Sequence, residues 1–211
     1  MAISAICKQC TGRVFEVLPG LWDECEPQGE SAQDEIMSLC FSMVLLSNME
    51  AGDEREMLIS NMLPRALRAL RSDESALRQI AARSMAEICQ ASPLKGMTAI
   101  IRSVIPVLGD VSDDWARLGA CEMLHRVTVE LGHDLLPYAV FFVVPILGGM
   151  SDSLPSIRET STKCFGTLLK ILPLEEGVPD PVGLDADLMT SKLTERSFLE
   201  QLLDTSKVWI V

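Results

Sequence analysis

The chain has 211 residues, of which 48% are apolar and 23% charged, and its 30 acidic against 18 basic residues give a net charge of −12. This apolar fraction excludes an intrinsically disordered chain, and 13 glycines with 11 prolines exclude a collagen-like or low-complexity chain. The acidic balance also argues against direct binding of naked nucleic acid, because lysines and arginines that displace counterions supply most of that affinity.

The first fifty residues are predicted to form a degenerate pair of helices. Pro19 has the place of a proline that recurs in the later units, and Ser31 is placed to cap the start of the second helix. If Asp34 stands where the later units carry an arginine, the apolar face of this helix falls seven and ten positions on, at Phe41 and Val44.

Residues 51–172 are predicted to form three helix pairs in clear register, which is set by three arginines at intervals of 39 and 41 residues: Arg78, Arg117 and Arg158. Small residues stand three and four positions after each arginine. Large apolar residues stand seven positions after it, at Met85, Leu124 and Phe165, and again at ten. These steps mark one face of a helix, and no stretch shows the sustained alternation of a strand.

Each unit also carries a start signal and a proline. A Ser-Asp pair precedes each arginine and marks a helix start: Ser72-Asp73, Ser112-Asp113 and Ser151-Asp152. A proline lies near the middle or end of each first helix, at Pro64, Pro106 and Pro145, where it removes a backbone donor and bends the helix. Two helices in about 40 residues is the spacing of HEAT or armadillo units. The sequence therefore predicts an all-α fold: a HEAT-repeat α-α superhelix, or solenoid, of about four helix pairs.

The recurring acidic and basic residues predict a structural ladder between adjacent units. Its members are Asp73, Arg78, Asp113, Arg117, Asp152 and Arg158. Exposed ion pairs of this kind are worth about 0–1 kcal/mol each.

The end of the chain departs from the array. Residues 173–184 are predicted to form a Pro/Gly linker, residues 185–204 an amphipathic helix, and residues 205–211 a divergent tail. Phe198 and Leu202, on the apolar side of this helix, are candidate partner contacts.

A second candidate partner contact is a group of three arginines spaced by three residues on one helix. Arg65, Arg68 and Arg71 could meet an acidic partner or a phosphate. The alternative interpretation is a solvated face of the array, and the sequence favours it.

The sequence gives little support for a catalytic site or a metal site. Seven cysteines, an odd number, and the lack of a signal peptide favour a reducing compartment in which thiols serve as small core residues. Cys7 and Cys10 have the spacing of a zinc half-site with Cys25 as a third ligand, but a matching pair is missing, so two thiols on a helix turn are favoured. His125 and His133 have no nucleophile partner.

Other functions are weighed on the same grounds. No phosphate-binding glycine loop is present. The apolar run 135–150 is too short and too interrupted by prolines and glycines to cross a membrane. We expect no catalytic residue, cofactor or metal on this chain.

Four stretches carry a resemblance to a known family: residues 63–67 (LPRAL), 112–117 (SDDWAR), 172–181 (LPLEEGVPDP) and 196–204 (RSFLEQLLD). They resemble the B-TFIID TATA-box-binding-protein-associated factors, nuclear HEAT-repeat proteins with a C-terminal SWI/SNF-type ATPase. The resemblance places this chain at the end of the HEAT array, just before the ATPase.

The resemblance implies that the parent binds TATA-binding protein and uses ATP to remove it from promoter DNA, regulating transcription by RNA polymerase II. It implies protein partners, namely TATA-binding protein and the parent's own ATPase domain, with DNA met only indirectly. No nucleotide-binding or hydrolytic residue carries over to this chain. The alternative is a generic HEAT adaptor of the nuclear-transport or phosphatase-scaffold type.

Overall fold

The computed structural model describes residues 31–172, 182–183, 185 and 187–188. In the described part every regular element is helical. The α-helices are α3 (Ala32–Leu46), α4 (Asp53–Ala69), α5 (Ser75–Ala91), α6 (Pro93–Ala99), α7 (Asp114–Leu131), α8 (Ala139–Gly149) and α9 (Pro155–Ile171). Shorter turns of π and 3-10 type are η1 (Ile100–Val104), η2 (Ile105–Gly109) and η3 (Gly132–Tyr138).

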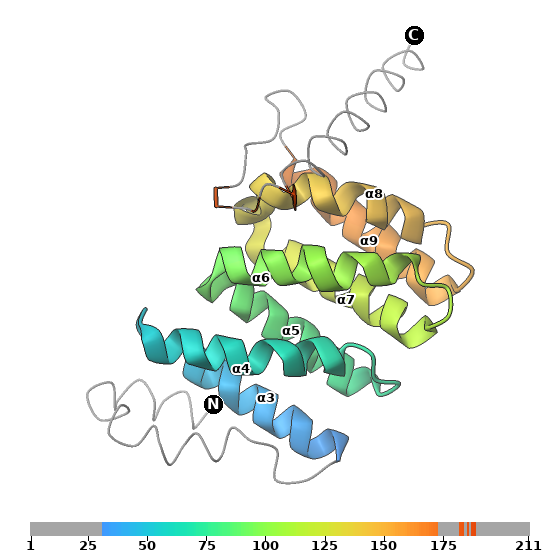
Figure 1. The fold of residues 1–211 in the computed structure, drawn as a ribbon. Coiled ribbons are helices and arrows are strands. Elements are labelled where there is room, and N and C mark those ends of the chain that lie inside the picture. Colours follow the sequence, from blue (N-terminus) through green and yellow to red (C-terminus); the bar gives the residue numbers. More distant parts are fainter. Residues whose placement is uncertain (1–30, 173–181, 184, 186, 189–211) are drawn as a thin grey trace.

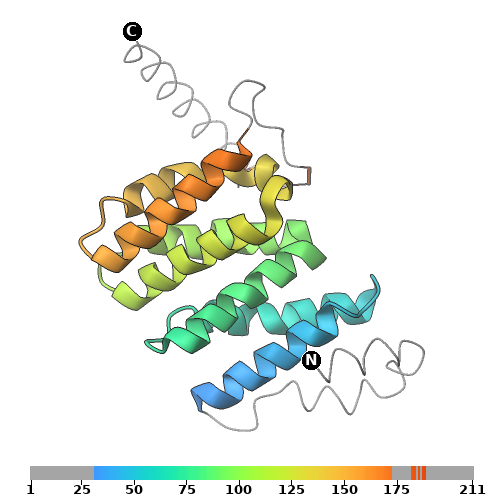
Figure 2. The same cartoon turned by 180° about the vertical axis from the view of Figure 1, so that it is seen from behind.

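The helices form two layers. In one layer α5 packs between α3 and α7, and α7 packs on α9. Figure 1 views the molecule from the second layer, where α4, α6 and α8 lie in front, and Figure 2 shows the first layer from behind. One apolar core runs through the stack from Leu39 to Leu168. The prediction of an all-α stack of helix pairs is confirmed.

The first described helix begins where the sequence predicted, but its register differs by one residue. The Ser31 hydroxyl accepts a hydrogen bond from the Asp34 N–H at 3.2 Å and caps α3. The buried face of α3 contains Ser38, Ser42 and Leu45, whereas the predicted Phe41 and Val44 are only half-buried. Glu35, not Asp34, therefore holds the place that Arg78 has in α5. Ser38 and Ser42 occupy core positions although they are polar, so the pattern of apolar residues in the sequence did not reveal this register.

Of the three predicted Ser-Asp helix starts, only the middle one caps its helix directly. The Asp113 carboxylate accepts from the Ala116 N–H at 2.9 Å. Ser72 and Asp152 lie before the caps of α5 and α9 and instead accept backbone N–H groups within the preceding turns.

The three prolines act differently from one another. α4 and α8 continue through Pro64 and Pro145 as α-helix. At Pro106 the first helix of the second unit passes from the π turn η1 into the 3-10 turn η2, because proline cannot donate the next α-helical bond.

The stretch Asp114–Gly149 is long and apolar enough to cross a membrane by length and composition alone, and half of its most apolar window is buried inside the protein. It is not one straight helix, because η3 separates α7 from α8. Both α7 and α8 pack on α9, so the need to fill the core accounts for its apolar composition.

Residues 1–30 and 189–211 lie outside the described residues. The first helix of the degenerate unit, most of the amphipathic helix at 185–204 and the divergent tail therefore stay predictions. Of the linker only residues 182 and 183 are described, followed by Asp185, Asp187 and Leu188. Arg102 binds Asp185 and Asp187, at 2.6 and 3.4 Å, and Leu188 joins the apolar core.

Gly119 permits the close approach of α7 to the end of α4. A Cβ built on Gly119 would lie 1.9 Å from the Leu70 carbonyl oxygen and 3.3 Å from Cδ of Arg78. Backbone cannot move aside as a flexible side chain can, so a larger residue must push the two units apart.

We predict that Gly119→Ala lowers the free energy of unfolding by about 1–3 kcal/mol, the usual cost of overpacking a core. The matched control is Gly166→Ala on α9, where a Cβ meets nothing within 4 Å. Gly166→Ala should be neutral or stabilising by up to about 1 kcal/mol, because alanine is the better helix former. Urea unfolding followed by circular dichroism measures both, and equal stabilities of the two variants would contradict the close contact.

Candidate protein-interaction surface

Arg78, near the start of α5, joins its own unit to the next one. The residue is 3% exposed, and its guanidinium donates to Ser72 O at 3.0 Å and Asp73 O at 2.9 Å. Its Nε donates to Oε2 of Glu122 on α7 at 3.0 Å, and its guanidinium carbon lies 5.1 Å from the centre of the Trp115 ring. The guanidinium thus binds carbonyls of its own turn and a carboxylate of the following unit.

Arg117 repeats this arrangement one unit further on. It is 2% exposed, donates to Asp110 O at 3.0 Å and pairs with Asp114 at 2.9 Å. Its Nε donates to Oδ2 of Asp152 at 2.9 Å, and Asp152 belongs to the turn before α9.

The Asp152 carboxyl is held in its charged form by its hydrogen-bond partners. Burial disfavours its charged form most strongly, but hydrogen bonds from the Leu154 N–H and from Arg117 outweigh burial, so the pKa of Asp152 lies below its ordinary value.

Arg65 makes the corresponding link backwards to α3. It is 7% exposed, its Nε donates to Glu35 at 3.1 Å, and its Nη2 donates to the Ser38 hydroxyl. The expectation that Arg65 shares an exposed surface with Arg68 and Arg71 is therefore wrong, because Arg65 is buried in the contact between α4 and α3.

The observed links differ in membership from the predicted ladder. Arg117 meets Asp152, and both are members of the predicted ladder, whereas Arg78 meets Glu122, which is not a member. Asp113 caps α7 instead, and Asp73 contributes its backbone carbonyl. Arg158 is exposed and donates to the carbonyls of Asp152 and Ser153, both at 2.8 Å. Glu122 stands 44 residues after Arg78, an interval close to one repeat. This interval is the sequence signal that could have identified Glu122 as the partner of Arg78.

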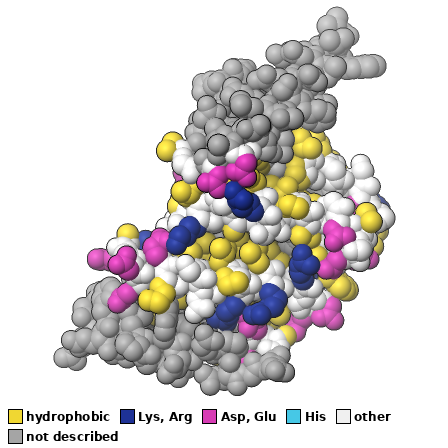
Figure 3. Space-filling model, in the orientation of Figure 1, with side chains coloured by type: hydrophobic (Ala, Val, Ile, Leu, Met, Phe, Trp, Pro, Cys, Tyr) yellow, Lys and Arg dark blue, Asp and Glu magenta, His cyan; other side chains and the backbone are white. Residues whose placement is uncertain are grey.

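A groove opens between α4 and the π and 3-10 turns of the second unit. It has a volume of about 280 Å³, and its apolar lining comes from Leu67, Leu70, Val104, Val107, Ala116 and Ala120. Arg68, Arg71 and Ser103 complete the lining. On this face, apolar side chains lie exposed in the centre with Lys and Arg around them (Figure 3).

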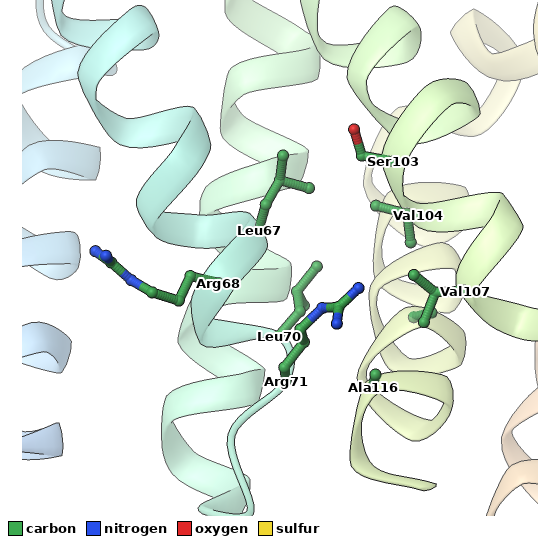
Figure 4. Close-up of a pocket in the computed structure, with 9 residues that line it drawn as sticks. Leu67, Arg68, Leu70, Arg71, Ser103, Val104, Val107 and Ala116 are labelled. Carbon is green, nitrogen blue, oxygen red and sulfur yellow. The ribbon is translucent and has the colours of Figure 1, made fainter. Parts of the chain in front are cut away.

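Arg68 and Arg71 point in different directions from α4. The Arg71 guanidinium reaches across the groove toward Val107, whereas that of Arg68 points to the other side of the helix (Figure 4). Arg71 lies 3.8 Å from the Asp113 carboxylate and is more than half exposed. The two arginines do not form one phosphate clamp, so the groove presents a single cation beside an apolar floor.

Of the four described cysteines, Cys89, Cys121 and Cys164 are buried and Cys40 is half-buried. Burial raises the pKa of the Cys89 and Cys164 thiols to about 12, and that of Cys121 to about 11. Among the described residues no group of three or more His, Cys, Asp or Glu is placed to hold a metal ion. Cys7, Cys10 and Cys25, and the partner contacts Phe198 and Leu202, lie outside the described residues.

Comparison with known proteins finds relatives over most of the chain, although no family model matches it. TATA-binding protein-associated factor mot1 of Aspergillus fumigatus is 36% identical over 87% of this chain. TATA-binding protein-associated factor mot1 of Schizosaccharomyces pombe is 38% identical over 83%, and human TATA-binding protein-associated factor 172 is 34% identical over 98%. The chain spans 10%, 9% and 12% of the lengths of these three relatives.

The fold assigns the chain to the all-α, solenoid-like proteins, and buried arginines join its neighbouring units. The sequence similarity identifies the family: the chain belongs to the TATA-binding protein-associated factors and is homologous to one segment of those long proteins.

We predict that Asp152→Asn lowers the free energy of unfolding at pH 7 by about 1.5–3 kcal/mol, the typical worth of hydrogen bonds to a charged group. Because the folded pKa of Asp152 is depressed, its contribution is complete above the unfolded value of about 3.9 and is lost as the pH falls through the folded value. The difference between wild type and variant should therefore shrink below about pH 4.

Glu159→Gln is the matched control, because Glu159 forms only an exposed pair with Lys163 at 2.7 Å in the same helix. Chemical unfolding of the three proteins between pH 3 and 7 measures these effects. Equal losses at Asp152 and Glu159 would contradict a special role for the link between α7 and α9.

Proposed function

We propose that the chain is a non-catalytic HEAT-repeat scaffold segment of a transcription regulator that binds TATA-binding protein and removes it from promoter DNA. The similarity to TATA-binding protein-associated factors over most of the chain carries this proposal. The two-layer stack with units of about 40 residues supports the HEAT assignment. The ATPase that supplies the work lies outside these 211 residues, and the protein acts in the nucleus on RNA polymerase II promoters.

The mechanism we propose is mechanical. Arg78 and Arg117 each hold a carboxylate of the next unit while bonded to carbonyls of their own unit. Breaking such a link leaves a buried charge without its partner, which costs several kcal/mol. A displacement at one end of the stack is therefore passed to the other end, so the segment can act as a rigid arm between a bound protein and the ATPase.

A second candidate function is a generic adaptor that holds another protein, of the nuclear-transport or phosphatase-scaffold type. The groove that Arg71 reaches across favours this candidate, because an apolar lining beside an exposed cation suits a peptide with an acidic residue next to apolar ones.

The two candidates are separated by binding of the full chain to purified TATA-binding protein and to the parent's ATPase domain, measured by pull-down and biolayer interferometry. We expect binding to at least one of the two. Absence of binding to both, with recovery of unrelated adaptor partners in a proximity screen, would contradict the first candidate.

We predict that Arg71→Glu weakens binding of the groove's partner at least tenfold, because it places a like charge opposite the partner's carboxylate. Arg83→Glu is the matched control, since Arg83 is an exposed arginine on α5, away from the groove lining. If the affinities of both variants equal that of wild type, the partner binds elsewhere on the stack.

A further inference from the structure

After α9 the chain returns to the second layer and makes a short contact with it. The described residues of this contact, which we call the strap, are Val182, Gly183, Asp185, Asp187 and Leu188. Gly183 has a φ of 85°, in the left-handed region that favours glycine. Its backbone lies against Leu94 at the start of α6, since a Cβ built on Gly183 would lie 3.3 Å from Leu94 Cδ2. The strap therefore turns where it meets α6.

The strap binds the stack through one cation and one apolar side chain. Arg102 of η1 donates from Nη2 to Oδ2 of Asp185 at 2.6 Å, and the same nitrogen lies 3.4 Å from the Asp187 carboxylate. Leu188 is buried and belongs to the apolar core. The surface around Arg102 thus binds carboxylates that stand beside an apolar residue.

These contacts leave most of the strap in solvent. The Arg102 side chain is 46% exposed, both aspartates are more exposed than Arg102, and Val182 is 89% exposed. Ion pairs this exposed stabilise a contact only slightly, because water solvates the separated charges almost as well. Leu188 is the one buried member among the described residues of the strap. The contact therefore rests on few interactions, and an equivalent segment can replace it.

The Arg102 site is next in sequence to the groove between α4 and the π and 3-10 turns. Arg102 directly precedes Ser103 and Val104, which line that groove. While the strap is bound, Asp185 and Asp187 occupy the Arg102 guanidinium. An acidic partner that reaches Arg102 has to compete with these two carboxylates.

We propose that the strap is a displaceable internal ligand of the second layer. It holds Arg102 until a protein segment with carboxylates beside an apolar residue takes its place. The partner is acidic because the site already binds that chemistry in Asp185, Asp187 and Leu188. The tether gives the strap a high effective concentration, so a partner displaces it only by making further contacts. The strap thus excludes weak acidic ligands from Arg102.

The bound strap is tested in the full 211-residue chain with the photoreactive residue p-benzoylphenylalanine in place of Val182, which is exposed. Irradiation followed by mass spectrometry should recover cross-links from position 182 to the α6 peptide that contains Leu94. A mixture of isotopically light and heavy chains distinguishes contacts within one chain from contacts between two copies.

A charge exchange tests the ion pairs of the strap. Arg102→Glu should lower the cross-link yield at least fivefold, and the added changes Asp185→Arg and Asp187→Arg should restore it. Arg83→Glu on α5 is the matched control and should leave the yield unchanged. Circular dichroism confirms that each variant keeps its helices.

Displacement is tested with a synthetic peptide that has the sequence of residues 182–188 and carries the same photoreactive residue in place of its valine. The peptide should label α6 at least fivefold more in a chain with Asp185→Asn, Asp187→Asn and Leu188→Ser than in the wild-type chain. Adding Arg102→Glu to that variant, or replacing both aspartates of the peptide by asparagine, should abolish the labelling.

The proposal would be overturned by any of four results. These are no cross-link from position 182 to α6, cross-links only between light and heavy chains, a yield that Arg102→Glu does not change, and equal peptide labelling of the wild-type and variant chains. All readouts use this chain and one peptide, so they do not depend on whether the stack binds TATA-binding protein.

Discussion

A guanidinium that leaves water needs acceptors held in place around it, and in this stack those acceptors come from two successive units. Arg78 and Arg117 are almost fully buried, and each binds backbone carbonyls on one side and a carboxylate of the next unit on the other. Removing either partner would leave an unpaired charge in the core. Such a pair adds little net stability but fixes how the units are placed relative to one another. The rest of the first layer depends on this constraint.

The close packing of α5, α7 and α9 follows from the same constraint. The glycine at 119 lets α7 approach the Leu70 carbonyl, and Trp115 lies against the Arg78 guanidinium. Among the described residues, no arginine joins one second-layer helix to the next in this way. There α4 and the broken helix around Pro106 stay apart, and the space between them is the groove over which Arg71 reaches. One layer is thus tightly joined, while the other offers a surface.

A tightly joined first layer and a grooved second layer suit a segment of a much longer protein. The chain is homologous to about a tenth of the TATA-binding protein-associated factors, and a joined layer can hold neighbouring segments in fixed relation while the grooved layer stays open to partners. Arg158 on α9, the last described helix, continues the arginine pattern that joins the units and binds the carbonyls of its own turn, but it has no carboxylate partner among the described residues.

The sequence by itself determined the class of fold and the positions of the helices, because apolar residues at helical spacing and a period near 40 residues report the two-helix unit directly. The sequence also identified the arginines that recur in each unit, since Arg78, Arg117 and Arg158 stand in register. Only the tertiary structure decided their partners: Arg78 meets Glu122, which the predicted ladder did not include, and Arg65 turns inward to Glu35. A repeat fixes which residues share a face of one helix. Which carboxylate comes within 3 Å of a guanidinium depends on how far one helix slides along the next, and that distance is set by packing across units that lie far apart in sequence.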